Sequence, residues 1–280
     1  MKLLQAAGVL SLLLILVVVN SLLNSGSGES PFNPNPVAAA AQRTQEVDGM
    51  RLAMKIRSSA EGQPDEVVKA DGAYNGETGL TAFTYHVLGA SSGAPAKFEA
   101  VMNEDAWYFR YPTMLAKMPE GKEWLMMKPL LDIENDNSMP TESPESALRM
   151  MSVSGGLRSL GGERVRGVQT KGYALDVEMT AVVAKLREQG QDDLADACEK
   201  VAPQMTGPVR MKVYIGGDEV VRRLDETMSV LVDGTPTTTR IRMDIFGLGA
   251  HPQIQLPPSS QVYDITPLIE EGVDALGDPS

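Results

Sequence analysis

The stretch Met50–Arg57 reads MRLAMKIR and decides the fold, because its character changes at every second residue. One set of side chains is Met, Leu, Met and Ile, and the other is Arg, Ala, Lys and Arg. A period of two predicts a β-strand with one buried face and one wet face. The same alternation predicts further strands at residues 67–74, 81–88, 97–102, 106–111, 173–179, 209–215, 224–232 and 240–245.

The strand pattern predicts an antiparallel sheet. Strands with one apolar face and short connections are typical of hairpins and meanders, whereas a doubly wound parallel sheet gives continuous apolar runs. Helical patterns interrupt the strands, and a large sheet with one apolar face needs such a cover. We expect helices over residues 38–47, 143–156, 180–190 and 192–201, and a last one beginning at Thr266-Pro267. Residues 112–142 show no clear period although they are apolar.

The N-terminal run Ala6–Leu23 contains no charged residue. As a helix it would be roughly 27 Å long, close to the thickness of a bilayer core. It is longer than the apolar region of most cleavable signal peptides. We therefore expect residues 1–28 to form a signal anchor, with a removed signal peptide as the alternative, and residues 29–37 to form a linker. Lys2 precedes the run, which favours an extracytoplasmic location for the rest of the chain.

The charge and the cysteine content exclude some classes of partner. The chain carries a net charge of −12, so by long-range electrostatics we expect neither nucleic acid nor anionic lipid headgroups as partners. The one cysteine, Cys198, leaves no intramolecular disulfide. Its place on an apolar helix face predicts a buried side chain rather than a reactive thiol.

No group of residues in the sequence points to catalysis or to a metal. The two histidines, His86 and His251, have no zinc-binding spacing or nucleophile motif around them. The glycine pairs at 155–156 and 161–162 lack the strand-to-helix turn of a phosphate loop. We expect no catalytic residue, no metal and no cofactor, and an enzyme is the least favoured class of function.

The positive signal is apolar. The chain has 16 methionines, and many fall on the apolar faces of the expected strands. Methionine is flexible and polarisable, so such a face either forms an ordinary core or lines a cavity for an apolar ligand. The candidate cavity residues are Met50, Leu52, Met54, Phe83, Tyr85, Met102, Trp107, Phe109, Met114, Met151, Leu175, Met211, Met228 and Met243.

Several motifs in order resemble a known family. They are VAAAAQRTQEVDGMRLAMKI from residue 37, AWYFRY from 106, PEGKEWLMM from 119, GGERVRGVQTKGYALDVEM from 161, PVRMKVYIGGDEVVRRLDETM from 208 and TRIRMDIFGLGAHPQIQLPPSSQVYDIT from 239. Over residues 38–265 they resemble the LppX/LprG-type bacterial lipoproteins of the LolA/LolB-like superfamily. The motifs are loose, and their order along the chain is their more specific feature.

The resemblance implies an α+β fold for residues 38–280. It is a strongly curved antiparallel β-sheet, or half-barrel, with helices packed on the concave face and an apolar cavity between them. The implied function is to bind a lipid or its acyl chains, as a carrier or chaperone of the cell envelope. The alternative is an interaction or stress-sensor module of the same fold, which binds an envelope protein partner and no lipid.

One departure from the family concerns the membrane anchor. The lipoproteins carry a cysteine just after the apolar run, and its acylation anchors them. Residues 20–30 of this chain contain no cysteine, so we expect no lipidation there. The N-terminal helix would then replace the lipid and hold a single-pass protein in the cell membrane. The protein would be secreted if this segment is cleaved.

Overall fold

The computed structural model describes residues 36–88, 96–103, 105–112, 115, 118–128, 157–188, 190, 192–232 and 234–267. The expected anchor at 1–28, most of the expected linker and the helix expected over 143–156 lie outside these residues. No helix in the described part of the chain has the length and the apolar character needed to cross a membrane.

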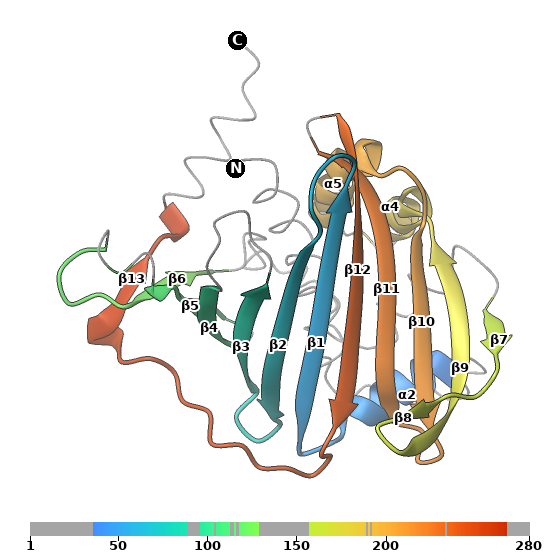
Figure 1. Cartoon of the computed structure of the whole chain (residues 1–280), viewed down its shortest axis with the longest axis horizontal. Coiled ribbons are helices and arrows are strands. Elements are labelled where there is room, and N and C mark those ends of the chain that lie inside the picture. The colour runs from blue at the N-terminus through green and yellow to red at the C-terminus, as the bar shows by residue number, and fades with distance from the viewer. Residues whose placement is uncertain are drawn as a thin grey trace.

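A 13-stranded sheet dominates the described part of the chain (Figure 1). Its strands are β1 (Gly49–Ala60), β2 (Glu66–Asn75), β3 (Leu80–Leu88), β4 (Ala96–Met102), β5 (Trp107–Arg110), β6 (Trp124–Met127), β7 (Arg158–Leu160), β8 (Arg164–Val165), β9 (Val168–Val177), β10 (Val209–Gly216), β11 (Val221–Val232), β12 (Thr235–Phe246) and β13 (Val262–Asp264). Their order is β13-β6-β5-β4-β3-β2-β1-β12-β11-β10-β9-β7, with β8 paired to β9 outside this path. Neighbours are antiparallel, except that β13 runs parallel to β6.

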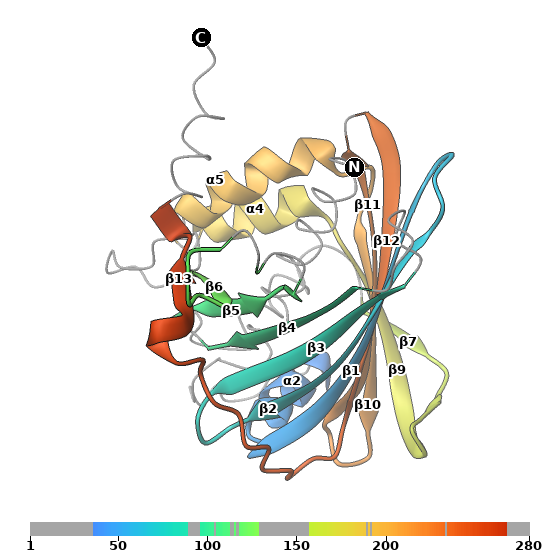
Figure 2. The same cartoon turned by 60° about the vertical axis from the view of Figure 1, so that its left-hand side comes forward.

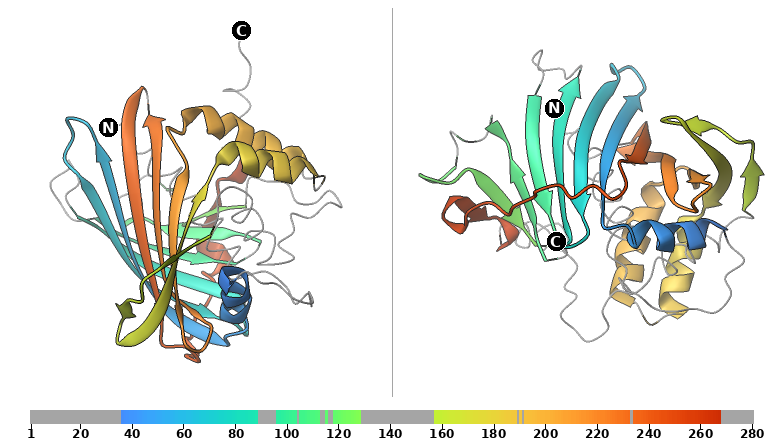
Figure 3. Two further views of the ribbon diagram at one scale, coloured as in Figure 1. Left: turned by 90° about the vertical axis from the view of Figure 1, so that its right-hand side faces the viewer. Right: turned by 90° about the horizontal axis from the view of Figure 1, so that it is seen from below.

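The sheet is strongly curved and unclosed, and the described helices lie on its concave side (Figure 2). They are α2 (Pro36–Gln45), α4 (Met179–Glu188) and α5 (Asp192–Val201), with two short 3-10 turns at Ala202–Gln204 and Ser259–Gln261. Helix α2 lies across one end of this side, and α4 and α5 lie together across the other end (Figure 3). The expected curved sheet with helices on its concave side is therefore confirmed. Below, the helix-covered side is called the inner face and the opposite side the outer face.

The apolar and polar residues that alternate in the sequence lie on the inner and the outer face, respectively. In β1, Met50, Leu52 and Met54 are buried on the inner face, whereas Arg51 and Lys55 are exposed on the outer face. The same pattern continues in β10, β11 and β12, whose burial alternates over most of their length. A one-residue slip in pairing would turn every apolar side chain outward, so the pattern fixes the register.

One strand ends earlier than the alternation predicts. A strand was expected over residues 173–179, but β9 ends at Val177 and Met179 begins α4. The carbonyl oxygen of Glu178 accepts hydrogen bonds from the backbone N–H groups of Ala181 (3.0 Å) and Val182 (3.1 Å). These bonds form a first helical turn at a position where the side-chain pattern alone fits a strand.

Helix α2 is tied to the sheet by one buried hydroxyl. Thr44 Oγ1 donates a hydrogen bond to the carbonyl oxygen of Ala40 (2.6 Å) and accepts one from the backbone N–H of Val221 (2.9 Å). Val221 begins β11, so this hydroxyl connects the last turn of the helix to a central strand. Buried Val37, Ala40 and Ala41 of the same helix belong to the main hydrophobic core.

Candidate functional site

The candidate cavity residues that the structure describes all lie in one hydrophobic cluster on the inner face. Each of them is buried: Met50, Leu52, Met54, Phe83, Tyr85, Met102, Trp107, Phe109, Leu175, Met211, Met228 and Met243. Met114 and Met151 lie outside the described residues. The fold therefore brings together apolar side chains from seven or more strands, including pairs far apart in sequence such as Met54 and Met243, which lie opposite each other.

The two halves of the inner face differ in kind. On β1, β12 and β11, Met54, Met243 and Leu224 form a continuous cross-strand row of flexible or branched aliphatic side chains. On β3 and β4, aromatic rings stack instead, with 4.4 Å between the ring centroids of Tyr85 and Phe98. Phe98 also stacks on Tyr111 at 4.8 Å. Burial raises the pKa values of the phenols of Tyr85 and Tyr111, so both rings stay neutral.

Gly72 of β2 makes room for one of these rings. A Cβ atom at this position would lie 2.3 Å from Cδ1 of Phe83, which is directly opposite in the register of β2 and β3. The ring of Phe83 therefore covers the glycine backbone, as often occurs where an aromatic side chain protects a glycine within a strand. The rigid aromatic half thus starts at β2 and β3, next to the methionine-rich half.

Glu226 is a polar residue within the methionine-rich half of the inner face. It occupies an inner-face position of β11, opposite Met211 and Ile241, and only 3% of its surface is exposed. Its Oε1 atom has no hydrogen-bond partner within the described residues. Loss of solvation raises the pKa of this carboxyl group to about 7. Near neutral pH it therefore exists in both forms, and the protonated form can donate a hydrogen bond.

Further polar groups lie beside Glu226, toward the end of the sheet that α4 and α5 cover. In the next row of the inner face, Thr239 lies opposite Met228 on one side and Ser58 on the other. The oxygen atoms of Ser58 and Thr239 are 3.2 Å apart. Glu66 lies opposite Ser58, and burial raises the pKa of its carboxyl group as well. These polar groups interrupt an inner face that is otherwise apolar, since Met228 and Val230 are buried in the same region.

Sequence reasoning missed Glu226, although a signal was present. The stretch Leu224–Val230 reads LDETMSV, in which the period of two places Glu226 between Leu224 and Met228 on the apolar face. A single carboxylate inside an apolar alternation is the pattern that reveals such a residue. Burial of a carboxyl group costs free energy because the group loses its solvation. A glutamate among buried methionines is therefore an unusual feature of the sequence.

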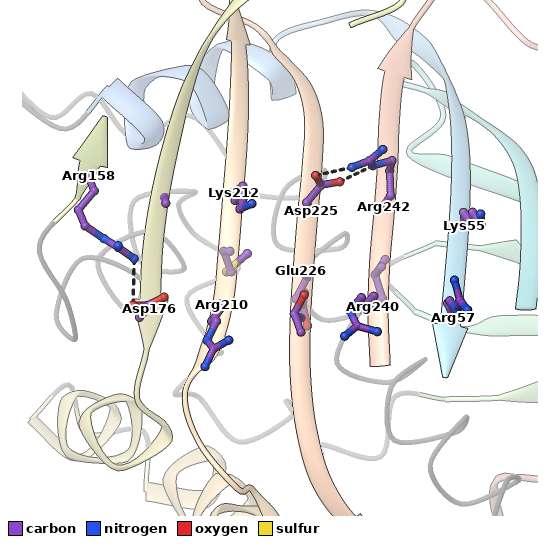
Figure 4. A pocket seen from close by; sticks show the side chains of 14 residues that line it. Lys55, Arg57, Arg158, Asp176, Arg210, Lys212, Asp225, Glu226, Arg240 and Arg242 are labelled. Atoms are coloured by element: carbon purple, nitrogen blue, oxygen red, sulfur yellow. Dashed lines mark hydrogen bonds and ion pairs between the residues drawn. The ribbon is translucent and has the colours of Figure 1, made fainter. Parts of the chain in front are cut away.

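The outer face carries a hollow of about 550 Å³ over β9, β10, β11, β12 and β1 (Figure 4). Its floor is β11, where Asp225 and Thr227 have short side chains. Basic side chains rise from the strands on either side, such as Arg210 on β10 and Arg240 on β12. The lining residues are Lys55, Arg57, Arg158, Ala174, Asp176, Arg210, Met211, Lys212, Asp225, Glu226, Thr227, Arg240, Ile241 and Arg242.

The other residues singled out in the sequence have ordinary surroundings. His86 and His251 are exposed, and His86 lies on the outer face opposite Lys69 and Lys97. Cys198 is partly buried against the core, and this burial raises the pKa of its thiol. Within the described residues, no three His, Cys, Asp or Glu side chains are grouped so that they could hold a metal ion.

Comparison with known proteins gives a distant relative in sequence. The chain is 22% identical over 256 residues to a Streptomyces griseus protein described as an uncharacterized 31.2 kDa protein in the rplA-rplJ intergenic region. The alignment covers 85% of this chain and 82% of that protein. No protein-family model matches the sequence.

Among solved structures, the chain is similar to two mycobacterial lipoproteins. Mycobacterium tuberculosis LppX matches with a TM-score of 0.45 and 10% identity, over 81% of this chain and 100% of LppX. Mycobacterium bovis LprF matches with a TM-score of 0.41 and 10% identity, over 80% of this chain and 94% of LprF. The sequence motifs resemble the family of these two lipoproteins. At this level of identity the likeness concerns the fold alone.

Proposed function

We propose that the protein binds a lipid, or another molecule with acyl chains and a polar end, against the inner face of the sheet. The observation that carries this proposal is the combination of a methionine-rich apolar face with the buried carboxyl group of Glu226, whose Oε1 atom has no hydrogen-bond partner within the described residues. A core that served stability alone would gain from a leucine at this position, because a carboxyl group loses its solvation on burial. A ligand with a polar end supplies the missing partner for that group.

The two halves of the inner face fit different tasks in this function. Flexible methionine side chains adapt to acyl chains of different length and shape. The stacked rings of Tyr85, Phe98 and Tyr111 form a rigid wall beside them. Helices α4 and α5 cover one end of the inner face (Figure 2). A ligand headgroup near Glu226, Ser58 and Thr239 would lie toward that end.

The place of action that we propose is the outer side of the cell membrane. The apolar run Ala6–Leu23 supports it, because its length suits a membrane anchor. An anchored domain cannot diffuse across the envelope, so it would hold or pass lipid close to the membrane surface. We favour a binding protein over an enzyme because the sequence shows no catalytic or metal-binding motif.

Native mass spectrometry together with fatty-acid uptake tests the proposal. We expect the purified protein to carry bound lipid and, once delipidated, to take up a fluorescent fatty acid. Met243→Trp should reduce this uptake, because the larger side chain occupies inner-face space between Met54 and Leu224. Ala53→Trp is the matched control on the outer face of β1, and it should leave uptake unchanged.

The opposite result is also informative. If the inner face is an ordinary filled core, the mass spectra will show bare protein and the wild type will take up no fatty acid. Met243→Trp will then lower only the stability, because overpacking of a filled core costs about 1–3 kcal/mol. In that case a protein-binding module becomes the better interpretation of the function. Cross-linking in cells should then recover a single membrane protein.

A further inference from the structure

The hollow on the outer face is strongly basic in an acidic protein. Seven of its fourteen lining residues are Lys or Arg, whereas the whole chain has a net charge of −12. Its acidic members on the outer face are Asp176 and Asp225. Because solvent and salt screen charges beyond roughly 8–10 Å, a ligand in the hollow is exposed to these local cations rather than to the net charge. The expectation that anionic groups are repelled holds for the chain as a whole and not for this face.

Within the described residues three of these cations form an ion pair and four do not, although the register places Asp176 opposite Arg210 and Asp225 opposite Lys212. Arg158 pairs with Asp176 at 3.0 Å, and Arg242 pairs with Asp225 at 2.7 Å. Arg57 pairs with Asp65. Within the described residues, no ion pair involves the remaining four, which are Lys55, Arg210, Lys212 and Arg240.

The strand register also places like charges directly opposite one another. Lys55 lies opposite Arg242, and Arg57 lies opposite Arg240, in the pairing of β1 with β12. On the other side of β1, Lys55 lies opposite Lys69. Like charges at opposed positions destabilise a sheet, and here Asp225 and Asp65 offset the charge of only one member of each β1–β12 pair, Arg242 and Arg57. A bound anion would remove the repulsion.

We propose that this hollow binds a phosphate-bearing ligand, either a free phosphorylated molecule or the phosphate of an anionic lipid headgroup. Arginine guanidinium groups match phosphate oxygens in pairs, and lysines add point charges. Arg210 and Arg240 stand on opposite sides of the β11 floor and can approach one ligand from both sides (Figure 4). A volume of about 550 Å³ lies within the usual range of small-molecule sites. The basic side chains of the hollow lie on the opposite face from the proposed lipid site, although the strands share Met211, Glu226 and Ile241 between the two sites. The phosphate proposal is argued from those basic side chains and does not rest on lipid binding.

Lysine acetylation in nanodiscs tests this site in the full-length protein. The protein is placed in phosphatidylcholine discs, treated with a limiting amount of acetic anhydride, and analysed by peptide mass spectrometry. Pyrophosphate at ten times its dissociation constant should slow acetylation of Lys55 and Lys212 roughly tenfold. The exposed Lys171 does not line the hollow and should react at an unchanged rate. Protection in discs that contain phosphatidylglycerol, without pyrophosphate, identifies the lipid headgroup as the source; protection by pyrophosphate alone identifies a free phosphate.

Two double variants distinguish a specific phosphate site from the general attraction of anions to positive charge. Arg210→Gln with Arg240→Gln should weaken pyrophosphate binding by roughly tenfold or more, since both charged hydrogen bonds from guanidinium groups to the phosphate oxygens are lost. Arg51→Gln with Arg164→Gln removes the same charge from exposed positions outside the hollow and should leave binding unchanged. The proposal is wrong if neither pyrophosphate nor phosphatidylglycerol protects the lysines of the wild type. It is also wrong if both double variants weaken binding equally.

Discussion

At the scale of single residues, Glu226 departs most clearly from the pattern of the chain. Its neighbours across the sheet, Met211 and Ile241, are apolar and buried, and its own carboxyl group has a pKa raised to about 7 by burial. A buried carboxyl group therefore makes stability depend on pH in a range where exposed carboxyl groups have finished titrating.

The pH dependence has a definite sign. Below pH 4.5, its ordinary pKa, the Glu226 carboxyl group is protonated in both the folded and the unfolded protein. Between pH 4.5 and about 7 the folded protein keeps the proton and the unfolded chain releases it. The free energy of unfolding should therefore fall by roughly 3 kcal/mol as the pH rises through this window.

Glu226→Gln should remove this loss, because an amide carries no charge at any of these pH values. We expect the variant to match the wild type at pH 4.5 and to be more stable at pH 8, as measured by urea denaturation. Glu77→Gln changes an exposed carboxylate and serves as the control. A variant that is less stable than the wild type at pH 8 would mean that the carboxylate has a stabilising partner.

At the scale of elements, the sequence predicts the long strands and does not predict their neighbours. Alternation over eight or more residues identifies β1, β10 and β12, because each has one apolar face. It cannot show that β1 pairs with β12, since that pairing joins segments about 190 residues apart and depends on the whole sheet. The basic hollow follows from this pairing, and for that reason it could not be predicted.

Short strands at the edges of the sheet are missed for a different reason. Strands β7, β8 and β13 have three residues or fewer, which is too short for a period to be recognised, and the four residues of β6, WLMM, are all apolar and do not alternate. Backbone bonds from other segments position them. The N–H of Glu123 bonds to the carbonyl oxygen of Gln261 (2.9 Å), and that of Ile265 bonds to the carbonyl oxygen of Met126 (2.9 Å). The side chains of these strands therefore indicate little about where the strands lie in the sheet.

The attachment of α2 to the sheet gives a prediction for Thr44. Thr44→Val keeps the shape of the side chain but leaves the backbone N–H of Val221 without its 2.9 Å bond. Because that N–H is buried, we expect a loss of roughly 1–3 kcal/mol in the free energy of unfolding. Urea denaturation measures the loss, with Thr84→Val on the outer face of β3 as the control. An equal effect in both variants would mean that the bond to Val221 contributes little.

The packing of β2 against the ring of Phe83 gives a prediction for Gly72. Gly72→Ala places a methyl group 2.3 Å from the ring and 2.9 Å from the carbonyl oxygen of Ala82, so one of them must move. Overpacking of this kind costs about 1–3 kcal/mol, and thermal denaturation should show it. Gly161→Ala meets no atom within 4 Å and should have little effect. A Gly72→Ala protein with wild-type stability would show that the ring is free to shift.

At the scale of the whole molecule, stability should decrease from the centre of the sheet to its edges. Strands β1, β11 and β12 are twelve residues long and are paired on both sides, whereas β7 and β13 have three residues each and lie at the two ends. We expect amide hydrogen exchange to be slowest in the first group and fastest in the second. Hydrogen-exchange mass spectrometry checks this order. Exchange in β1 as fast as in β7 would contradict a single cooperative sheet.

The pairing of β1 with β12 also determines when the protein can fold. Leu52 lies opposite Ile245, so one side of β1 has no partner until the chain has been made as far as β12. Until then, the early strands present a long edge of unpaired N–H and C=O groups, which invites pairing with other chains. Such distant pairings also form slowly. A chain that stops before Thr235 would keep this edge open permanently, so β12 protects the first strand from aggregation.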